Sequence, residues 1–414
     1  MADVILKDVR LPDGKVTDIV LEQGRVVHLG SSKGYSSETV FSGHNRLIIP
    51  AATDMHVHMR DSIQGAKEDW RTGTMSAVAG GVATVVDQPN SIPPMETREN
   101  FLTRLSMAKE KAFCRFAING SLTEKADIKG LASAGALAFG EMFAGPSSYG
   151  SALSPETIAR VTREAAELGK LITVHAETVT GGAVHSLQEH DASRTTAGEV
   201  SAIALVKSLA PDHARLHFCH LSSAASIAAV GANATFEVAP HHLFLSYDDA
   251  GCSFTDSHKK MNPPIRSKAE RLRLMQQFEK IPVIASDHAP HTPEEKYAEF
   301  GNAPSGVPGV ETMLPLLMKE VFEGRFPLAS VIEKTVINPN TILGIESPGF
   351  LKGARADFAV YNPSPEIIRG ENLHSKCGWT PYEGMHGLFP AATVVSGILA
   401  WDGSEFSREG SEQI

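Results

Sequence analysis

"SPETIARVTREAAELGKLITVHAE", residues 154–177, joins a helix signal directly to a strand signal. Ser154 is suited to cap a helix whose first position is Pro155, and apolar residues then recur with helical spacing as far as Gly169. The apolar run "KLITVH", residues 170–175, predicts a buried strand. A helix followed at once by an almost wholly apolar strand is typical of a parallel sheet covered by helices.

The same alternation continues on both sides of this unit. Eight apolar runs predict strands, namely "RLIIPA" (46–51), "VATVV" (82–86), "AFCRFAI" (112–118), "GALAF" (135–139), "KLITVH" (170–175), "ARLHFC" (214–219), "ATFEVA" (234–239) and "IPVIAS" (281–286). Stretches with helical periodicity lie between them, such as residues 67–81, 97–112, 196–210 and 267–281. Eight such units favour an α/β fold of the (β/α)8 TIM-like barrel type over the alternative, a doubly wound sheet.

The two ends of the chain have a different pattern. Residues 2–30 read as short strands separated by the turns "PDG" and "EQG", and the tail repeats this style around "WDG". We therefore expect a small β-sandwich built from both chain ends, residues 1–49 and 351–414, beside a barrel that spans residues 50–350.

Composition narrows the class of protein. The 414 residues carry a net charge of −10, which argues against a general nucleic-acid binder and against a basic membrane-binding patch. No apolar run is long enough to span a bilayer, and the N-terminus has no signal-peptide pattern. The four cysteines contain no C-x-x-C pair, so we expect reduced thiols and a cytoplasmic location.

Polar side chains follow nearly every predicted strand. Catalytic residues of such barrels lie at the carboxyl ends of the strands, so these side chains are expected to meet at one face. The residues are His56, His58 and Arg60, then Asp87 and Asn90, Glu141, His175 and Glu177, His220, Glu237, His241 and His242, and finally Asp287, His288 and His291. Any one of these histidines alone would more often be a hydrogen-bonded core or surface residue, but the joint pattern favours a metal site.

The residue types indicate the chemistry. Alternate positions of an extended chain face one side, so His56 and His58 can hold one cation, with Arg60 beside it for an anionic substrate. Imidazole and carboxylate ligands suit zinc. A hydroxide held by zinc is a nucleophile near neutral pH, and a carboxylate must move its proton to the leaving nitrogen. Asp287, after the last strand, is suited to that role.

Several long motifs resemble one known family. "DMHVHMRD" (54–61), "KEDWRTGTMSAVAGGVATVVDQPNSIPP" (67–94), "VHAE" (174–177), "CHLSS" (219–223), "EVAPHHLFLS" (237–246), "MNPPIRS" (261–267), "SDHAPHTPEEK" (286–296), "GVPGVETMLPLL" (306–317) and "SKCGWTPYEGM" (375–385) are similar to dihydroorotase of the class I and multifunctional-complex type. That family belongs to the amidohydrolase superfamily, with a metal-bearing barrel and a small β domain. The resemblance covers nearly the whole chain and implies reversible conversion of N-carbamoyl-L-aspartate to L-dihydroorotate, the third step of pyrimidine synthesis.

The resemblance also implies roles for individual residues. His56, His58 and Asp287 would bind a first metal ion, and His175 and His220 a second. Asp287 would in addition be the general base and acid. The substrate carboxylate would bind Arg60, Asn90 and His291, and the pyrimidine ring would contact Asn262.

One position departs from the animal-type pattern, in which a carboxylated lysine after strand four bridges two metals. Here residues 135–143 contain no lysine, and Glu141 is the nearest equivalent. The resemblance therefore implies one or two zinc ions per chain, with Glu141 either a metal ligand or a residue that caps the following loop.

Alternatives remain for the function and for some residues. The chain could be a related cyclic amidase such as allantoinase or a hydantoinase, although Arg60 with Asn90 and His291 favours an anionic substrate. A non-catalytic assembly partner would be expected to have lost metal ligands. Glu177 and Glu237 could orient histidines or contact a metal. "GNAPSGVPG", residues 301–309, could be a mobile cover for the site or an ordinary surface loop. Expected partners are the small-molecule substrate and a second copy of the chain or other pyrimidine-pathway enzymes.

Overall fold

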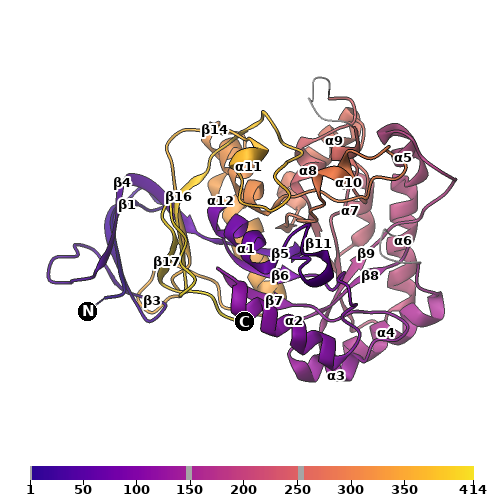
Figure 1. The fold of residues 1–414 in the computed structure, drawn as a ribbon, viewed down its shortest axis with the longest axis horizontal. Helices are drawn as coiled ribbons and strands as arrows, with labels where there is room; N and C mark the ends of the chain where they lie inside the picture. The colour runs from indigo at the N-terminus through magenta and orange to yellow at the C-terminus, as the bar shows by residue number, and fades with distance from the viewer. Residues whose placement is uncertain (1, 146–151, 250–255) are drawn as a thin grey trace.

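The computed structural model describes residues 2–145, 152–249 and 256–414. Two groups of strands are separated in space (Figure 1), with strands from both chain ends on one side and the strands between residues 52 and 284 on the other. No described helix is both long and apolar enough to cross a membrane. Cys114, Cys219 and Cys377 are buried free thiols, whereas Cys252 lies outside the described residues.

Both chain ends contribute to one seven-stranded sheet. Its order is β17-β16-β13-β4-β1-β2-β3, with β1 Val4–Arg10, β2 Val16–Glu22, β3 Arg25–Leu29, β4 Thr39–Pro50, β13 Phe358–Tyr361, β16 Pro390–Val395 and β17 Ile398–Trp401. The predicted turns at residues 12–14 and 22–24 join β1, β2 and β3 as expected. Strands β4 and β13 pair antiparallel, which joins the N-terminal strands to the tail.

Eight further strands pair in chain order and all in parallel. They form a three-stranded sheet, β5 Ala52–Val57, β6 Val82–Asp87 and β7 Arg115–Ile118, and a five-stranded sheet, β8 Phe139–Phe143, β9 Leu171–His175, β10 Arg215–Phe218, β11 Thr235–Val238 and β12 Val283–Ile284. Isolated parallel bridges link Gly120 to Phe139 and Val57 to His288. These bridges join the two sheets at both ends, so the carboxyl ends of all eight strands face the same region.

Helices separate these strands, as the sequence predicts. The longer ones are α1 Trp70–Ala79, α2 Arg98–Lys111, α4 Pro155–Glu167, α6 Thr196–Leu209, α9 Lys268–Met275 and α11 Val310–Phe322. Ser154 is the N-cap of α4, and its side chain accepts a hydrogen bond from the Thr157 amide, with Pro155 at the first helical position. The helix and strand predicted within residues 154–175 therefore form as expected.

Several predicted strands have different bounds in the structure, and two of them differ most. The run "RLIIPA" does not form the first parallel strand, because residues 46–50 end β4, in which residues 46 and 47 pair with β1 and residues 48–50 pair with residues 358–360 of the tail. The first parallel strand is β5, two residues later. The run "GALAF" also begins too early, since Gly135 caps helix α3 (Ile128–Ala134) in the left-handed conformation and β8 starts at Phe139.

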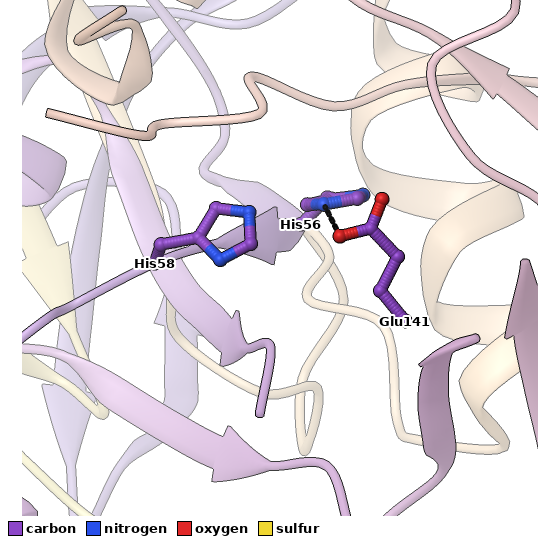
Figure 2. A group of neighbouring side chains, drawn as sticks. All are labelled: His56, His58 and Glu141. Carbon is purple, nitrogen blue, oxygen red and sulfur yellow. Dashed lines mark ion pairs between the residues drawn. The ribbon is translucent and has the colours of Figure 1, made fainter. Parts of the chain in front are cut away.

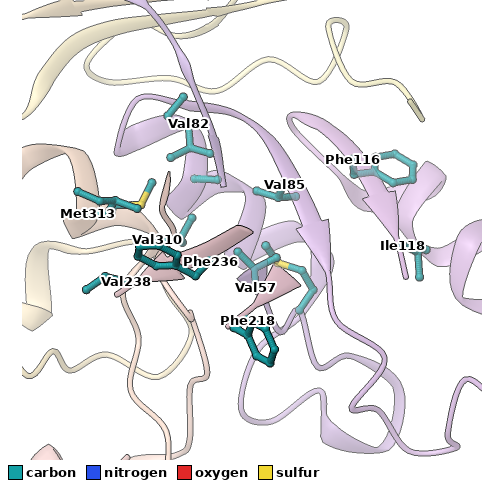
Figure 3. Packing of buried hydrophobic residues seen from close by; sticks show 14 of the residues in the cluster. Val57, Val82, Val85, Phe116, Ile118, Phe218, Phe236, Val238, Val310 and Met313 are labelled. Atoms are coloured by element: carbon teal, nitrogen blue, oxygen red, sulfur yellow. The ribbon is translucent and has the colours of Figure 1, made fainter. Parts of the chain in front are cut away.

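The largest apolar core lies among the parallel strands and the helices that cover them. Figure 3 shows part of it, with Val57, Val85 and Phe218 of β5, β6 and β10 in the middle, Met313 of α11 to the left and Phe116 of β7 to the right. All five side chains are buried. At about 25 cal/mol per Å² of apolar surface removed from water, each large side chain of this kind contributes roughly 1.5–3 kcal/mol. This core fixes the strands whose carboxyl ends carry the polar residues.

Candidate metal centre and active site

One cavity brings together seven of the fifteen residues predicted from the strand ends. It is lined by His58, Arg60, Asn90, Glu141, Phe143, His175, His220, Asn262, Asp287, Ala289, Ser305 and Gly306. These residues come from segments spread over the whole region from β5 to the loop after β12, which agrees with the expectation that the strand ends meet at one face.

Glu141 lies at the centre of the histidine cluster. Its Oε1 atom is 2.9 Å from His175 Nδ1 and 2.8 Å from His220 Nε2. Its Oε2 atom is 3.8 Å from His56 Nε2 and accepts a hydrogen bond from Asn90 Nδ2 at 2.9 Å. Figure 2 shows the Glu141 carboxylate aimed at His56, with His58 beyond it. The two oxygens of one carboxylate thus face different histidines.

Asp287 lies on the His56 and His58 side of this cluster. Its Oδ1 atom is 3.5 Å from His56 Nε2 and 3.3 Å from His58 Nε2. The residue follows β12 and has a φ of 48°, which is the left-handed region. Asp287 and Glu141 therefore approach His56 Nε2 together.

Carboxylates also hold the outer nitrogens of two histidines. Glu237 Oε1 accepts a hydrogen bond from His56 Nδ1 at 2.6 Å, and Glu177 Oε2 accepts one from His175 Nε2 at 2.7 Å. His56 consequently presents Nε2 to the cavity and His175 presents Nδ1. Of the two roles left open for Glu177 and Glu237, these contacts favour orientation of the rings. Cys219 groups with His56 and Glu237 and does not line the cavity.

The charges of the cluster shift several pKa values. Burial raises the pKa of Glu141, but hydrogen bonds from His175 and His220 outweigh this effect and hold that pKa well below its ordinary value. Burial lowers the pKa of His175, but Glu141 and Glu177 raise it to about 9. Burial also raises the pKa of Asp287, and His58 and the charge of His56 more than reverse that rise. Contacts with the neighbouring histidines thus favour the ionised forms of Glu141 and Asp287.

The donor set fits divalent metal ions. Two groups of ligand atoms, His56 with His58 and Glu141, and Glu141 with His175 and His220, each lie within 4.8 Å of one another and are buried. Among the described residues, His56 Nε2 has no hydrogen-bond partner although it points into the cluster. A buried imidazole nitrogen that has no hydrogen-bond partner and lies among imidazole and carboxylate groups is suited to bind zinc, because the ion would supply the missing contact.

Arg60 lies in the cavity wall beside this cluster. Its backbone φ is 48°, so the extended chain assumed for residues 56–60 ends before it, and β5 stops at Val57. Arg104 Nη1 donates to the Arg60 carbonyl at 2.5 Å, and Arg104 Nε donates to Asp87 Oδ2 at 2.6 Å. Through Arg104, Asp87 thus supports the turn that carries Arg60. No pattern in the sequence had indicated the contact between Asp87 and Arg104.

His291 lies next to this cavity. It does not line the cavity above but borders an adjoining, larger cavity together with Asn90 and Lys67. Its Nε2 donates to the Ser305 carbonyl at 3.0 Å, and its Nδ1 accepts from Lys67 Nζ at 3.2 Å. Both ring nitrogens therefore already have partners.

The remaining polar residues of the strand ends have mainly supporting contacts. Asn262 lines the cavity, and its Oδ1 accepts from His190 Nε2 at 3.0 Å. His288 Nδ1 accepts from the Gly309 amide at 3.2 Å, and its Nε2 is 3.4 Å from the buried carboxylate of Glu68. His242 Nε2 donates to the Pro263 carbonyl at 3.0 Å. Glu68 and His190 were not singled out from the sequence, because no local pattern marks them, whereas Ser305 and Gly306 lie in the "GNAPSGVPG" stretch named as a candidate cover of the site.

Comparison with known proteins gives relatives over the full length. A model described as the amidohydrolase family matches residues 47–400. The dihydroorotase of Methanosarcina acetivorans is 36% identical, over 97% of this chain and 92% of that protein. The dihydroorotase of Halobacterium salinarum is also 36% identical, over 97% of both chains.

Solved structures of hydantoin-cleaving enzymes are similar in fold. The L-hydantoinase (dihydropyrimidinase) of Arthrobacter aurescens has a TM-score of 0.89 at 25% identity, over 100% of this chain and 99% of that one. The dihydropyrimidinase of Brevibacillus agri has a TM-score of 0.86 at 21% identity, over 100% and 98% of the two chains. The higher identities are to the dihydroorotases. Since the family model and these relatives span nearly the whole sequence, the chain belongs to the amidohydrolase family, among the dihydroorotases.

Proposed function

We propose that this chain interconverts L-dihydroorotate and N-carbamoyl-L-aspartate, by hydrolysis and closure of the cyclic amide. The observation that carries the proposal is the position of Arg60 and Asn90 in the same cavity as the cluster of Glu141, His175, His220 and Asp287. A cation beside a hydrolytic centre suits a substrate that bears a carboxylate next to the amide to be cleaved. The dihydroorotase relatives support the same reading.

We propose that zinc occupies the cluster, with one or two ions per chain. His56, His58 and Asp287 would hold one ion and His175 and His220 the other, with Glu141 contacting either or both. When bound, zinc supplies Lewis acidity and lowers the pKa of water that it holds. Support comes from the buried, converging imidazole and carboxylate atoms and from the unpartnered His56 Nε2.

Asp287 is proposed as the general base and acid. It would accept the proton of the attacking water and deliver it to the amide nitrogen as the ring C–N bond breaks, with the reverse transfer during ring closure. Its carboxylate is ionised in the cluster and lies within 3.5 Å of two imidazole nitrogens. A base that is hydrogen-bonded on one side and open to the cavity on the other can make this transfer.

Substrate binding is proposed for Arg60, Asn90, His291 and Asn262. Arg60, Asn90 and His291 would bind the carboxylate, and Asn262 would contact the ring. His291 is the member of this set whose two nitrogens are already engaged, by Ser305 and Lys67, so its contact with the carboxylate requires exchange of one of those partners.

The overall architecture is proposed to be a (β/α)8 barrel with a β-sandwich, divided at residues 49/50 and 350/351. The bridges between residues 120 and 139 and between residues 57 and 288 support closure of the eight parallel strands. The seven-stranded sheet, with its own apolar cluster, supports a separate unit made from both chain ends.

The reaction is testable with purified protein. We expect turnover of dihydroorotate in the hydrolytic direction and of carbamoyl aspartate in the reverse direction, both lost on chelation and restored by zinc. Formation of carbamoyl aspartate is followed by chromatography, with allantoin and hydantoin as comparison substrates. Robust turnover of either comparison substrate with none of dihydroorotate would refute the assignment.

A second test addresses recognition of the carboxylate. Lysine keeps the charge of Arg60 but loses its planar, two-pronged donor arrangement, so Arg60→Lys should raise KM and lower kcat/KM for dihydroorotate by about tenfold or more. Zinc content, measured by elemental analysis, should stay at the wild-type value. If the variant instead lost zinc and kept its KM, Arg60 would be a support for the histidines rather than a substrate ligand.

A further inference from the structure

Two buried lysines near the cavity bind backbone carbonyls instead of carboxylates. Lys296, the last residue of α10 (Pro293–Lys296), is 0% exposed. Its Nζ donates to the carbonyls of Lys260 at 3.1 Å, Pro304 at 3.0 Å and Gly306 at 3.0 Å. Three carbonyls match the three N–H donors of an ammonium group, whereas a neutral amine would turn its lone pair toward one of them.

Lys260 binds backbone carbonyls in the same way, and its partners lie a few residues before Pro304 and Gly306 in the chain. Its side chain is also buried, and Nζ donates to the carbonyls of Phe300 at 2.6 Å and Ala303 at 2.7 Å. An aromatic ring covers each ammonium, Phe300 at 4.9 Å from Lys260 Nζ and Trp379 at 5.5 Å from Lys296 Nζ. Both lysines therefore bind the segment that runs from residue 300 to residue 306.

This segment ends in the wall of the catalytic cavity. Ser305 and Gly306 line the cavity, and the Ser305 carbonyl accepts the hydrogen bond from His291. Gly306 has a φ of +132°, and a Cβ there would lie 2.6 Å from the Ala289 carbonyl oxygen, so the backbone at this point passes too close for any side chain. The Gly306 amide in turn donates to the Lys260 carbonyl at 3.0 Å.

Burial of these two ammonium groups costs free energy unless other contacts compensate for it. An ammonium group loses its hydration when it is buried, and a paired carboxylate is the usual compensation. In the described part of the chain, neither Lys260 nor Lys296 has a carboxylate oxygen within 4.0 Å. The carbonyl dipoles and the two rings replace it, and they also restrict the loop to one conformation, because each ammonium needs several carbonyls at once.

We propose that Lys260 and Lys296 are positioning residues for substrate binding, which hold the backbone of residues 300–306 so that Ser305 and Gly306 form a fixed wall of the cavity. This differs from both readings of the "GNAPSGVPG" stretch, a mobile cover and an ordinary surface loop, because its first part would be a fixed wall of the site. The proposal rests on dihydroorotate as the substrate, and it goes further by assigning part of the affinity to two residues that would not touch the substrate.

The test replaces each lysine by methionine, which keeps much of the side-chain volume and removes the donors. Lys296→Met should raise KM for dihydroorotate by about tenfold, change kcat by less than about threefold and leave zinc content unchanged. Hydrogen–deuterium exchange should become at least tenfold faster in the peptide covering residues 300–306. Lys260→Met should show the same pattern and serves as the second variant if Lys296→Met does not fold.

Lys334→Met is the matched control. Lys334 is 2% exposed and donates to a backbone carbonyl, that of Glu279 at 3.3 Å, and its Nζ lies over Phe278, but neither it nor its partners line the catalytic cavity. It should lose stability without a change in KM. If Lys296→Met and Lys260→Met behaved like this control, with lower melting temperature and wild-type KM, the positioning role would be overturned. If wild-type protein did not turn over dihydroorotate, the proposed function would fail first, and unchanged exchange of residues 300–306 in the variants would still overturn the loop assignment.

Discussion

Asp287→Asn should lower kcat for dihydroorotate by about 10²–10⁴-fold while much of the zinc is retained, because general acid–base catalysis contributes an effect of that size. Asparagine keeps an oxygen at the position that lies 3.3 Å from His58 Nε2 and 3.5 Å from His56 Nε2, so a ligand remains available. The amide cannot take up the proton of the attacking water. Loss of the proton acceptor, rather than loss of the ion, should then account for the defect.

Steady-state kinetics and elemental analysis of the same preparation separate these two causes. Asp357→Asn is a matched control, since Asp357 is also a buried aspartate but contacts Arg115 and Arg355 away from the cavity. We expect that control to lose stability and to keep its turnover per folded molecule. Near-wild-type turnover of Asp287→Asn would remove Asp287 from proton transfer, and a complete loss of zinc would reassign it to metal binding alone.

Local patterns in the sequence were sufficient for most helices and for the convergence of the strand ends. Capping by Ser154 and the helical period of residues 155–167 act within a few residues of one another, so they can be read directly. The strand-end rule then groups His56, His175, His220 and Asp287, because parallel strands in chain order must present their carboxyl ends to one region.

Long-range pairing is what the sequence could not show. The apolar run at residues 47–50 looks like any buried strand, and only its pairing with β1 and with residues 358–360 of β13 assigns it to the seven-stranded sheet. The contact between Glu237 and His56 and the capture of loop carbonyls by Lys296 likewise join residues with no shared local motif. A buried lysine that binds carbonyls has the same sequence signal as a solvated one.

The position of Arg60 illustrates a further limit. Alternation along an extended chain predicts that His56, His58 and Arg60 share a face, but the chain leaves the strand after Val57. Arg60 adopts a positive φ, and Arg104 holds its carbonyl. His58 and Arg60 nevertheless line one cavity, although the extended conformation on which the prediction depended does not continue to Arg60.

Glu141→Ala should remove at least one zinc ion per chain and reduce activity by more than about 100-fold. Loss of a residue that only orients a metal ligand costs at most about 100-fold, so a larger effect indicates direct binding. The reason lies in the two faces of the carboxylate. Oε1 lies within 3 Å of His175 and His220, whereas Oε2 points toward His56 at 3.8 Å. Two divalent ions close together repel each other, and an anion with one oxygen toward each ligand group offsets that repulsion without a carboxylated lysine.

Glu177→Ala provides the comparison for Glu141, because Glu177 is a buried carboxylate that holds His175 from the opposite ring nitrogen. It should cost about 10–100-fold in zinc affinity or activity, as expected for an orienting partner.

Glu141→Gln, which keeps the shape and removes the charge, should resemble Glu141→Ala in zinc content if the negative charge is what the ions require. Zinc stoichiometry measured on the three variants decides between the roles: a larger loss for both Glu141 variants than for Glu177→Ala indicates direct ligation. Unchanged zinc and turnover in Glu141→Ala would instead make the residue a hydrogen-bond acceptor for Asn90 and the histidines, and would leave any second ion without a protein-derived bridge.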